Sequence, residues 1–288
     1  MKSKAWTEKF MQGVFLAAAC ASVLAVALIC FFLFANGVPA MKEIGFLDFL
    51  TGELWKPGND IYGIFPMIIG SIYVTAGAIL VGVPIGILTS VFMAYYCPKK
   101  IYRPLKSATE LLAGIPSIVY GFFGLMVLIP LVRQLFPGKT NGQSMLTASV
   151  LLGMMILPTI IGVTESAFRA VPRAYYEGAL ALGATHERSI FTVILPAAKS
   201  GVMAAVVLGI GRAIGETMAV MMVVGNQPRI PDGLLKGVRT LTTNIVLEMG
   251  YAADLHREAL IATAVVLFVF ILIINFTVAC LNRKMVRE

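Results

Sequence analysis

An arginine and a glutamate stand together in one of the long apolar stretches of this chain. Arg212 and Glu216 are spaced by one helical turn, and Thr217 follows them. A charge at mid-membrane costs about 2.5 to 3.5 kcal/mol on insertion scales, so such residues usually face a bundle interior or a water-filled path. A guanidinium presents a planar fork of donors that suits phosphate oxygens. We therefore expect Arg212, Glu216 and Thr217 to line a substrate path, unless the two charges only neutralise each other.

A second candidate is the loop after the fourth apolar stretch, which reads VPRAYYEGALALGATHERSIFTVILP from residue 171 to residue 196. Pro172 suits the first turn of a helix, and Gly183 can end that helix in a left-handed conformation. Thr185 can cap a second helix, with Glu187 near its positive end. The pattern predicts a compact helix-turn-helix that fits a groove on another protein. The alternative is an amphipathic hairpin that lies on the bilayer surface.

The elements that position these residues are membrane helices. The chain has 288 residues, of which 58% are hydrophobic and 13% are charged, whereas about 25% are charged in a soluble domain. Apolar runs of about 20 residues, enough to cross a bilayer, recur along the sequence. We expect an all-α polytopic membrane protein with about six spans and no soluble catalytic domain between them. The spans are Phe15 to Phe34, Ile68 to Met93, Leu111 to Leu131, Leu146 to Val163, Val202 to Val224, and Leu260 to Cys280.

Basic residues indicate the orientation, because cytoplasmic loops retain Lys and Arg. They gather before the first span, after the second, after the fourth and in the tail: Lys2, Lys4, Lys9, Lys99, Lys100, Arg103, Lys106, Arg169, Arg173, Arg188, Lys199, Arg283, Lys284 and Arg287. This distribution predicts that both termini are cytoplasmic in a bacterial inner (plasma) membrane. The formal net charge of +8 then reflects topology and a lipid bilayer as partner, and no nucleic acid is expected.

The predicted organisation has three parts. Residues 1–36 hold the N-terminal tail and a first span that is too long for a signal peptide and is expected to be retained. Residues 37–65 form a periplasmic loop whose Phe46, Phe49, Trp55 and Pro57 suggest an ordered cap, or only an interfacial aromatic belt. Residues 66–288 form the permeation core, with the cytoplasmic loop at 169–199 inside it.

Other chemistry is not expected. Gly138-Lys139-Thr140 looks like the end of a phosphate-binding P-loop, but Arg133 stands where that pattern requires glycine. His186 and His256 lie in loops on opposite sides of the predicted membrane. The cysteines Cys20, Cys30, Cys97 and Cys280 form no C-x-x-C. We predict no disulfide, no catalytic residue, no metal site and no cofactor bound by this chain.

The loop at 171–196 resembles the EAA loop of ABC importer permeases, a Glu-Ala-Ala sequence followed at fixed spacing by Gly and by Ile-x-Leu-Pro. The matching residues are Glu177, Ala179, Gly183, Leu195 and Pro196, while Gly178 and Val193 replace alanine and isoleucine. The resemblance implies the type I ABC importer permease fold. It also implies that Glu177, Gly178, Ala179 and Gly183 transmit closure of an ATPase subunit, and that ATP is bound by those partner subunits and not by this chain.

Further segments resemble the phosphate-specific (Pst) permeases of the PstC type over nearly the whole chain: Tyr62-Gly63-Ile64-Phe65-Pro66, Ala113 to Gly121, Gly215 to Val220, and Leu241 to Ile245. This resemblance implies import of inorganic phosphate. The implied partners are a second permease (PstA type), two ATPase subunits (PstB type) and a periplasmic or lipid-anchored phosphate-binding protein (PstS type). Arg212 is then the first candidate for contact with the anion, with Glu216 orienting it or accepting a proton and Thr217 adding a hydroxyl.

Three alternatives remain open from the sequence, the last of them a purely structural or sensory membrane protein. The first is a permease for another tetrahedral oxyanion, sulfate or molybdate, which could use the same loop and an arginine. The second is a proton- or sodium-coupled carrier in which Glu216 is the ion site. Such carriers are commonly built from inverted repeats, and no clear internal repeat is visible in the sequence.

Overall fold

Several helices of this chain begin at or next to a proline, as at Pro66, Pro98 and Pro116. The computed structural model describes residues 2–287, with the side chains of 2–7, 278, 279 and 281–287 left out. The side chains of Lys2, Lys4, Arg283, Lys284 and Arg287, which the predicted orientation used, thus lie outside the described part. The helices are α1 (Lys2–Ile44), α2 (Phe46–Thr51), α3 (Phe65–Val91), α4 (Lys99–Gly114), α5 (Ser117–Phe123), α6 (Ile129–Leu135), α7 (Met145–Ala170), α8 (Arg173–Ala181), α9 (His186–Ser189), α10 (Leu195–Ala197), α11 (Lys199–Gly215), α12 (Met218–Val223), α13 (Leu241–Glu248) and α14 (Asp254–Arg287).

Short irregular segments connect several of these helices. π-Helical turns extend α3 (Phe92–Tyr96), join α5 to α6 (Gly124–Leu128) and join α9 to α10 (Ile190–Ile194). A hairpin of β1 (Trp55–Lys56) and β2 (Ile61–Tyr62) pairs antiparallel, with Trp55 opposite Tyr62, around a 3₁₀ turn at Pro57–Asn59. The predicted all-α class is therefore confirmed, apart from this small hairpin.

Five helical segments in the described residues are long and apolar enough to cross a membrane. They run over Glu8–Ile44, Phe65–Tyr96, Ser117–Leu135, Met145–Ala170 and Asp254–Thr277, and a sixth forms if the pair His186–Ala197 and Lys199–Gly215, bent by 71°, counts as one span. The expected number of spans agrees, while their bounds differ, and two of the differences come from breaks in the helices. The third span starts at Ser117 because Pro116 breaks the helix before it, and the fifth helix ends at Gly215 instead of continuing to Val224.

The centre of the bundle is built from α3, α7 and α11. Glycines bring α3 close to α7: a Cβ added at Gly82 would meet Ile156 at 2.7 Å, and one at Gly86 would meet Ile160 at 2.7 Å. Both isoleucines are fully buried. The close backbone approach expected for small residues in membrane helices is therefore present between α3 and α7.

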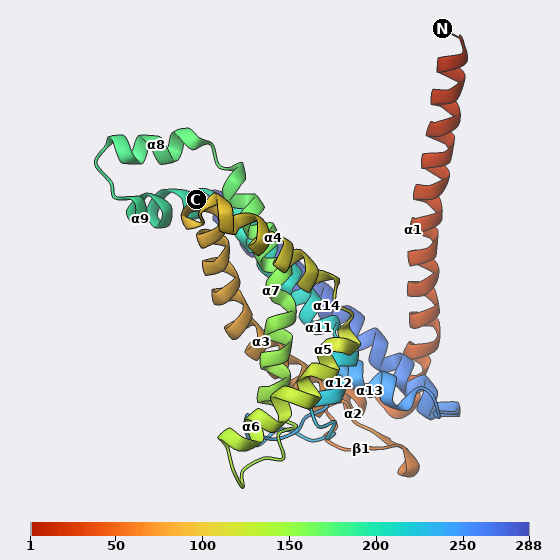
Figure 1. The fold of residues 1–288 in the computed structure, drawn as a ribbon. Helices are drawn as coiled ribbons and strands as arrows, with labels where there is room; N and C mark the ends of the chain where they lie inside the picture. Colours follow the sequence, from red (N-terminus) through yellow and green to blue (C-terminus); the bar gives the residue numbers. More distant parts are fainter. Residues whose placement is uncertain (1, 288) are drawn as a thin grey trace.

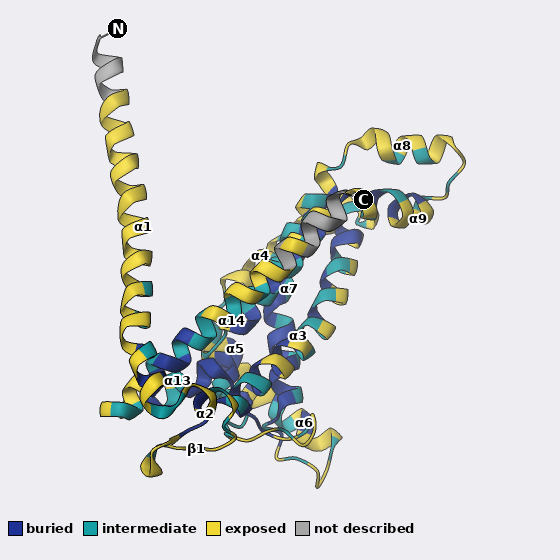
Figure 2. Cartoon of the chain, turned by 180° about the vertical axis from the view of Figure 1, so that it is seen from behind, coloured by how far each residue is buried: buried dark blue, intermediate teal, exposed yellow. Residues whose placement is uncertain are grey.

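Helix α1 stands apart from this bundle along most of its length (Figure 1), and its side chains are exposed there (Figure 2). It meets α14 only near its C-terminal end, where Gly37 lies against Val265 and Ala262. We call the end of the bundle that carries α8 and α9 the loop end. The opposite end, which carries α2, the β-hairpin and α13, we call the cap end (Figure 1).

The cap end is ordered, as the sequence suggested. Phe49, Trp55 and Tyr62 are buried in one cluster with residues of α13 and α14. Only Phe46 of the predicted cap aromatics is well exposed, at 59%. Because Phe49 and Trp55 are buried in protein, the explanation by an interfacial belt does not account for them.

Candidate functional site

Two helices are broken where they run through the middle of the bundle. Helix α11 ends at Gly215, and Glu216 is extended with ψ at 127° before α12 begins at Met218. Helix α4 ends at Gly114, and Ile115 and Pro116 are extended before α5 begins at Ser117. Pro116 explains the second break, since proline has no N–H to donate and disfavours helical geometry in the residue before it.

The two breaks are joined by hydrogen bonds. Ser117 Oγ donates to Glu216 Oε2 at 2.9 Å, and the backbone N–H of Ala219 donates to Glu216 Oε1 at 3.2 Å. Thr242 Oγ1 donates to the Glu216 carbonyl oxygen at 3.2 Å, which adds α13 to the junction. Glycine permits the contact, because a Cβ at Gly121 would lie 3.0 Å from the Ala219 backbone. Glu216 is thus fixed at the crossing of α4–α5 with α11–α12.

Arg212 is not part of this junction. It is half-buried on α11 and forms no hydrogen bond or ion pair with any described residue, although it lies within electrostatic reach of Tyr120. The contact between Arg212 and Glu216, which the sequence left open as neutralising or orienting, is absent among the described residues. The reason is the break at Gly215: Glu216 leaves the helix and turns its carboxylate to Ser117 and α12. The guanidinium remains available for an anion, and Thr217 Oγ1 donates locally to the Gly215 carbonyl at 3.2 Å.

A buried carboxylate that the sequence reading missed ties α7 to α4. Glu165 is 2% exposed and accepts hydrogen bonds from Tyr102 Oη at 2.6 Å, Lys106 Nζ at 2.9 Å and Arg169 Nε at 2.8 Å. The hydrogen bond to Glu165 raises the pKa of Lys106, against the opposing effect of burial, and raises the pKa of Tyr102. The predicted fourth span stopped at Val163, and Arg169 was used only as a topology marker. The i,i+4 spacing of Glu165 and Arg169 was the available signal.

The loop at 171–196 has the predicted shape. Helix α8 is followed by Gly183 with φ at +84°, whose N–H donates to Leu180 O at 2.9 Å. Thr185 caps α9 by accepting from the Arg188 N–H at 3.3 Å. The hairpin of α8 and α9 projects from the bundle (Figure 1). Glu177, Gly178 and Gly183 are exposed on it, as is Pro196 after it, while Ala179 and Leu195 are half-buried.

The exposed face of this hairpin is partly apolar. Leu182 is 91% exposed and Tyr175 is 53% exposed. Behind the hairpin, Phe168, Ile190 and Ile194 form a buried cluster that anchors it to α7. His186 supports the same packing, because its Nδ1 lies 2.6 Å from Tyr176 Oη. A hairpin that is anchored at its base and has uncovered apolar side chains is suited to docking on another protein.

The second buried charge cluster lies at the cap end. Glu248 accepts from Trp55 Nε1 at 2.8 Å and from Arg239 Nη1 at 2.6 Å, and it lies 2.9 Å from His256 Nε2. His256 thus belongs to a structural network. No group of His, Cys, Asp and Glu suited to a metal ion occurs in the part of the chain that the structure describes, and all four cysteines are free.

Comparison with known proteins decides the family. The family model described as "Binding-protein-dependent transport system inner membrane component" matches residues 82–287. The chain belongs to this family. The permease is 37% identical over 272 residues to "Phosphate transport system permease protein PstC" of Mesorhizobium japonicum, covering 88% of this chain and 82% of the relative. It is 38% identical to "Probable ABC transporter permease protein YqgH" of Bacillus subtilis, covering 92% and 90%.

Solved structures show the same fold. The inward-facing MetNI methionine ABC transporter matches with a TM-score of 0.64 at 20% identity, covering 81% of the permease and 99% of that chain. A bacterial alginate ABC transporter in complex with its alginate-bound periplasmic protein matches with a TM-score of 0.61 at 14% identity, covering 93% and 94%. The permease is therefore a multi-pass inner-membrane subunit with the type I ABC importer fold. Its relatives are transport components without a catalytic ATPase site, which work with ATPase and binding-protein partners.

Proposed function

We propose that this chain is the PstC-type permease of an importer for inorganic phosphate. The curated relatives described above include phosphate permeases at 37% identity over most of their length. Within the molecule, the observation that carries the proposal is Arg212. It is a half-buried guanidinium beside the crossing of two broken helices, and no described carboxylate neutralises it.

The path runs past this crossing. A phosphate anion contacts Arg212 through its oxygens, since a guanidinium donates in the planar geometry that such oxygens accept. Thr217 adds a hydroxyl next to the break. Glu216 has a different role from the one predicted: held by Ser117 and Ala219, its negative charge limits how tightly an anion binds nearby. A brief contact of this kind favours release over trapping.

The connection to the ATPase follows from the order of the elements. The α8–α9 hairpin continues through the π-helical turn at Ile190–Ile194 and α10 into α11, and α11 carries Arg212 and ends at the break. Leu195 and Pro196 lie at the bend of 71° between these parts. When an ATPase subunit moves the hairpin at Glu177, Gly178, Ala179 and Gly183, α11 transmits the movement to the crossing.

The remaining parts of the proposal concern topology and partners. We infer that both termini and the loop at 169–199 are cytoplasmic and that the loop at 37–65 faces the periplasm. ATP binds at two PstB-type subunits and not on this chain. A PstA-type permease completes the path, and a PstS-type protein delivers phosphate at the cap end.

Uptake of labelled anions tests the substrate. In cells that lack their own phosphate systems, the complex with its partner subunits should import phosphate, and excess sulfate or molybdate should not compete. Import of sulfate or molybdate in preference to phosphate would assign the permease to the alternative oxyanion. Membership of the ABC permease family disfavours the ion-coupled carrier, and loss of uptake after inactivation of the ATPase subunit is the matching check.

A further inference from the structure

The loop end contains a cavity that the transport path does not use. It has a volume of about 700 Å³ and lies between the end of α3, the start of α4 and the last turn of α7. Its lining residues are Met93, Ala94, Cys97, Lys99, Lys100, Tyr102, Arg103 and Arg169. Four of these side chains are cationic, and none is a carboxylate.

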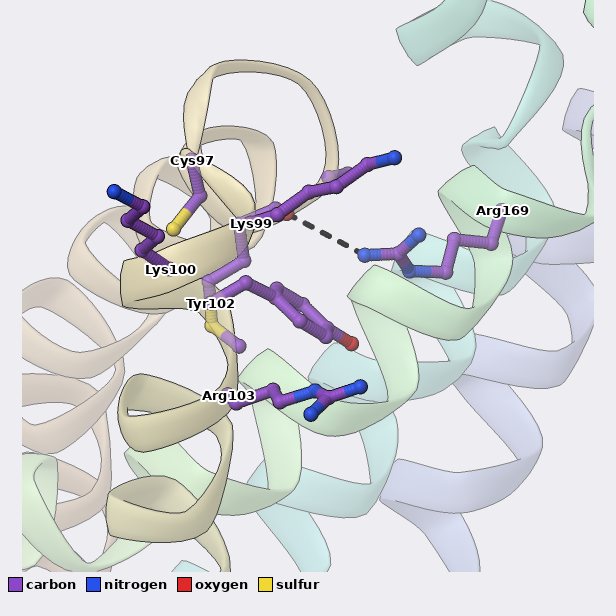
Figure 3. Close-up of a pocket in the computed structure, with 8 residues that line it drawn as sticks. Cys97, Lys99, Lys100, Tyr102, Arg103 and Arg169 are labelled. Carbon is purple, nitrogen blue, oxygen red and sulfur yellow. Dashed lines mark hydrogen bonds between the residues drawn. The ribbon is translucent and has the colours of Figure 1, made fainter.

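Three of the cations lie on the side of the cavity where α4 faces α7. Figure 3 shows Lys99 and Arg103 of α4 extending toward Arg169 of α7, with the Tyr102 ring between them and Lys100 pointing the other way. Arg169 is held in place, because Nε donates to buried Glu165 at 2.8 Å and its guanidinium lies 4.8 Å from the centroid of the Tyr102 ring. Neither Lys99 nor Arg103 forms an ion pair with a described residue. Glu165 offsets the charge of Arg169, and Lys99 and Arg103 add positive charge to the cavity that no described acid pairs with.

The start of α4 adds to this field. Pro98 precedes the helix and offers no side-chain cap, and the first turn contains no acidic residue. The hydrogen bonds to Pro98 O come from Ile101 and Tyr102, which leaves the first backbone N–H groups of this helix of 16 residues without intrahelical acceptors. Such a helix start favours a bound anion. Side chains and backbone thus point to the same ligand charge.

The location indicates which anions can reach the cavity. It lies where the spans Phe65–Tyr96 and Met145–Ala170 end, the depth at which lipid headgroups and the aqueous phase meet. Phe92, Tyr96 and Ile101 beside it are exposed apolar side chains, on which acyl chains can lie. Basic pockets between membrane helices at such a surface are suited to anionic headgroups.

We propose that this basic pocket, formed by Lys99, Arg103 and Arg169, binds the phosphate group of an anion, either a phospholipid headgroup or free orthophosphate. A bound phosphate group bridges α4 and α7 one turn before the α8–α9 hairpin. It stabilises the same contact between these helices that Glu165 makes from the interior. The pocket is separate from Arg212 and does not depend on the identity of the transported substrate.

The test compares two anion sources on the assembled complex without its binding protein, delipidated in neutral detergent. One arm titrates phosphatidylglycerol against phosphatidylcholine and counts retained lipid by native mass spectrometry. The other arm titrates orthophosphate against chloride at equal ionic strength and follows thermal stability. The variant is Lys99→Gln with Arg103→Gln. The matched control is Lys100→Gln, which removes one cation from the same helical turn but points away from Arg169 in Figure 3.

Loss of both cations should lower the affinity for the anion that the unmodified complex binds by about 30-fold. Each surface cation contributes about a fivefold factor toward an anionic headgroup. The control should change it by less than about fivefold. The charge-preserving pair Lys99→Arg with Arg103→Lys should retain binding, which separates loss of charge from loss of folding. A response to lipid alone assigns the site to headgroups, and a response to orthophosphate alone assigns it to the free anion. No response in either arm, or an unchanged response in the double Gln variant, overturns the proposal.

Discussion

Ser117 donates a hydrogen bond of 2.9 Å from its hydroxyl to the Glu216 carboxylate, and this contact joins two helices at the points where each is broken. Broken membrane helices leave backbone groups without helical partners, so they occur where protein or a water-filled path can satisfy them. Here protein groups do so: Glu216 accepts from Ser117 and from the start of α12, and Arg212 lies one turn before it on α11. In the proposed path, this crossing is where a substrate and a moving α11 would meet.

Removing the Ser117 hydroxyl should loosen this crossing. Ser117→Ala leaves Glu216 Oε2 without its donor, and a hydrogen bond to a charged group contributes about 1.5 to 3 kcal/mol. Because the site is only partly buried, we expect a loss of about 1 kcal/mol in stability and slower phosphate uptake by the assembled complex. Ser107→Ala, at an exposed position of α4, is the control. Equal uptake in both variants would show that the crossing does not matter for transport.

The left-handed glycine of the docking hairpin should couple ATP hydrolysis to transport. A side chain at Gly183 meets no neighbour within 4 Å, so Gly183→Val acts through backbone strain of about 1 to 2 kcal/mol and through its bulk toward a partner. Membrane insertion should be normal, ATP hydrolysis should persist, and uptake per ATP should fall. Gly138→Val is a matched control, because Gly138 also has positive φ at +71° and open space but lies in another loop. If both variants transport equally well, Gly183 is not the coupling bend.

The buried carboxylate at the loop end should hold α4 on α7. Glu165→Gln removes the charge that accepts from Tyr102, Lys106 and Arg169. The side chains of Lys106 and Arg169 are 31% and 50% exposed, so solvent can stabilise their charges in part. We therefore expect a loss of about 2 kcal/mol in the free energy of unfolding, less than for a fully buried ion pair. Thermal unfolding of the purified complex measures this loss. Glu110→Gln on the exposed face of α4 should change stability by less than about 0.5 kcal/mol. A similar loss of stability in both variants would argue that Glu165 does not hold α4 on α7.

The cap should depend on the indole of Trp55. Trp55→Phe keeps a ring against Tyr62 but removes the donor to Glu248, which is 2.8 Å away, at a cost of about 1 to 3 kcal/mol for a buried acceptor. Limited proteolysis from the cap side should cleave residues 45–62 faster than in the unmodified protein. Phosphate uptake should also fall if the binding protein delivers phosphate at the cap. Phe46→Leu, at a position that is 59% exposed, should leave the proteolysis rate unchanged. Unchanged cleavage in Trp55→Phe would show that the indole hydrogen bond does not order the cap.

Much of this structure could be predicted from local sequence chemistry. Pro172, Gly183 and Thr185 act within a few residues of themselves, so the hairpin could be derived from capping and from left-handed glycine. The buried Trp55 in the cap likewise agrees with the sequence.

The misses involve contacts between distant segments. A pairing of Arg212 with Glu216 was left open because four residues make about one turn, yet the helix breaks between them and a serine 99 residues away donates to the carboxylate. Glu165 was hidden for the same reason, since two of its three partners lie on α4, 59 and 63 residues away. Periodicity along one helix cannot reveal which other helix supplies a partner.

Uptake of labelled phosphate by Arg212→Ala, assembled with its partner subunits and hydrolysing ATP, tests the central claim most directly. Loss of a charged contact to the anion should lower the rate by about 10- to 100-fold, corresponding to about 1.4 to 2.8 kcal/mol. Arg212→Lys should recover only part of it, because lysine keeps the charge but loses the planar fork. A normal rate of phosphate uptake in the assembled Arg212→Ala complex would contradict the proposed path.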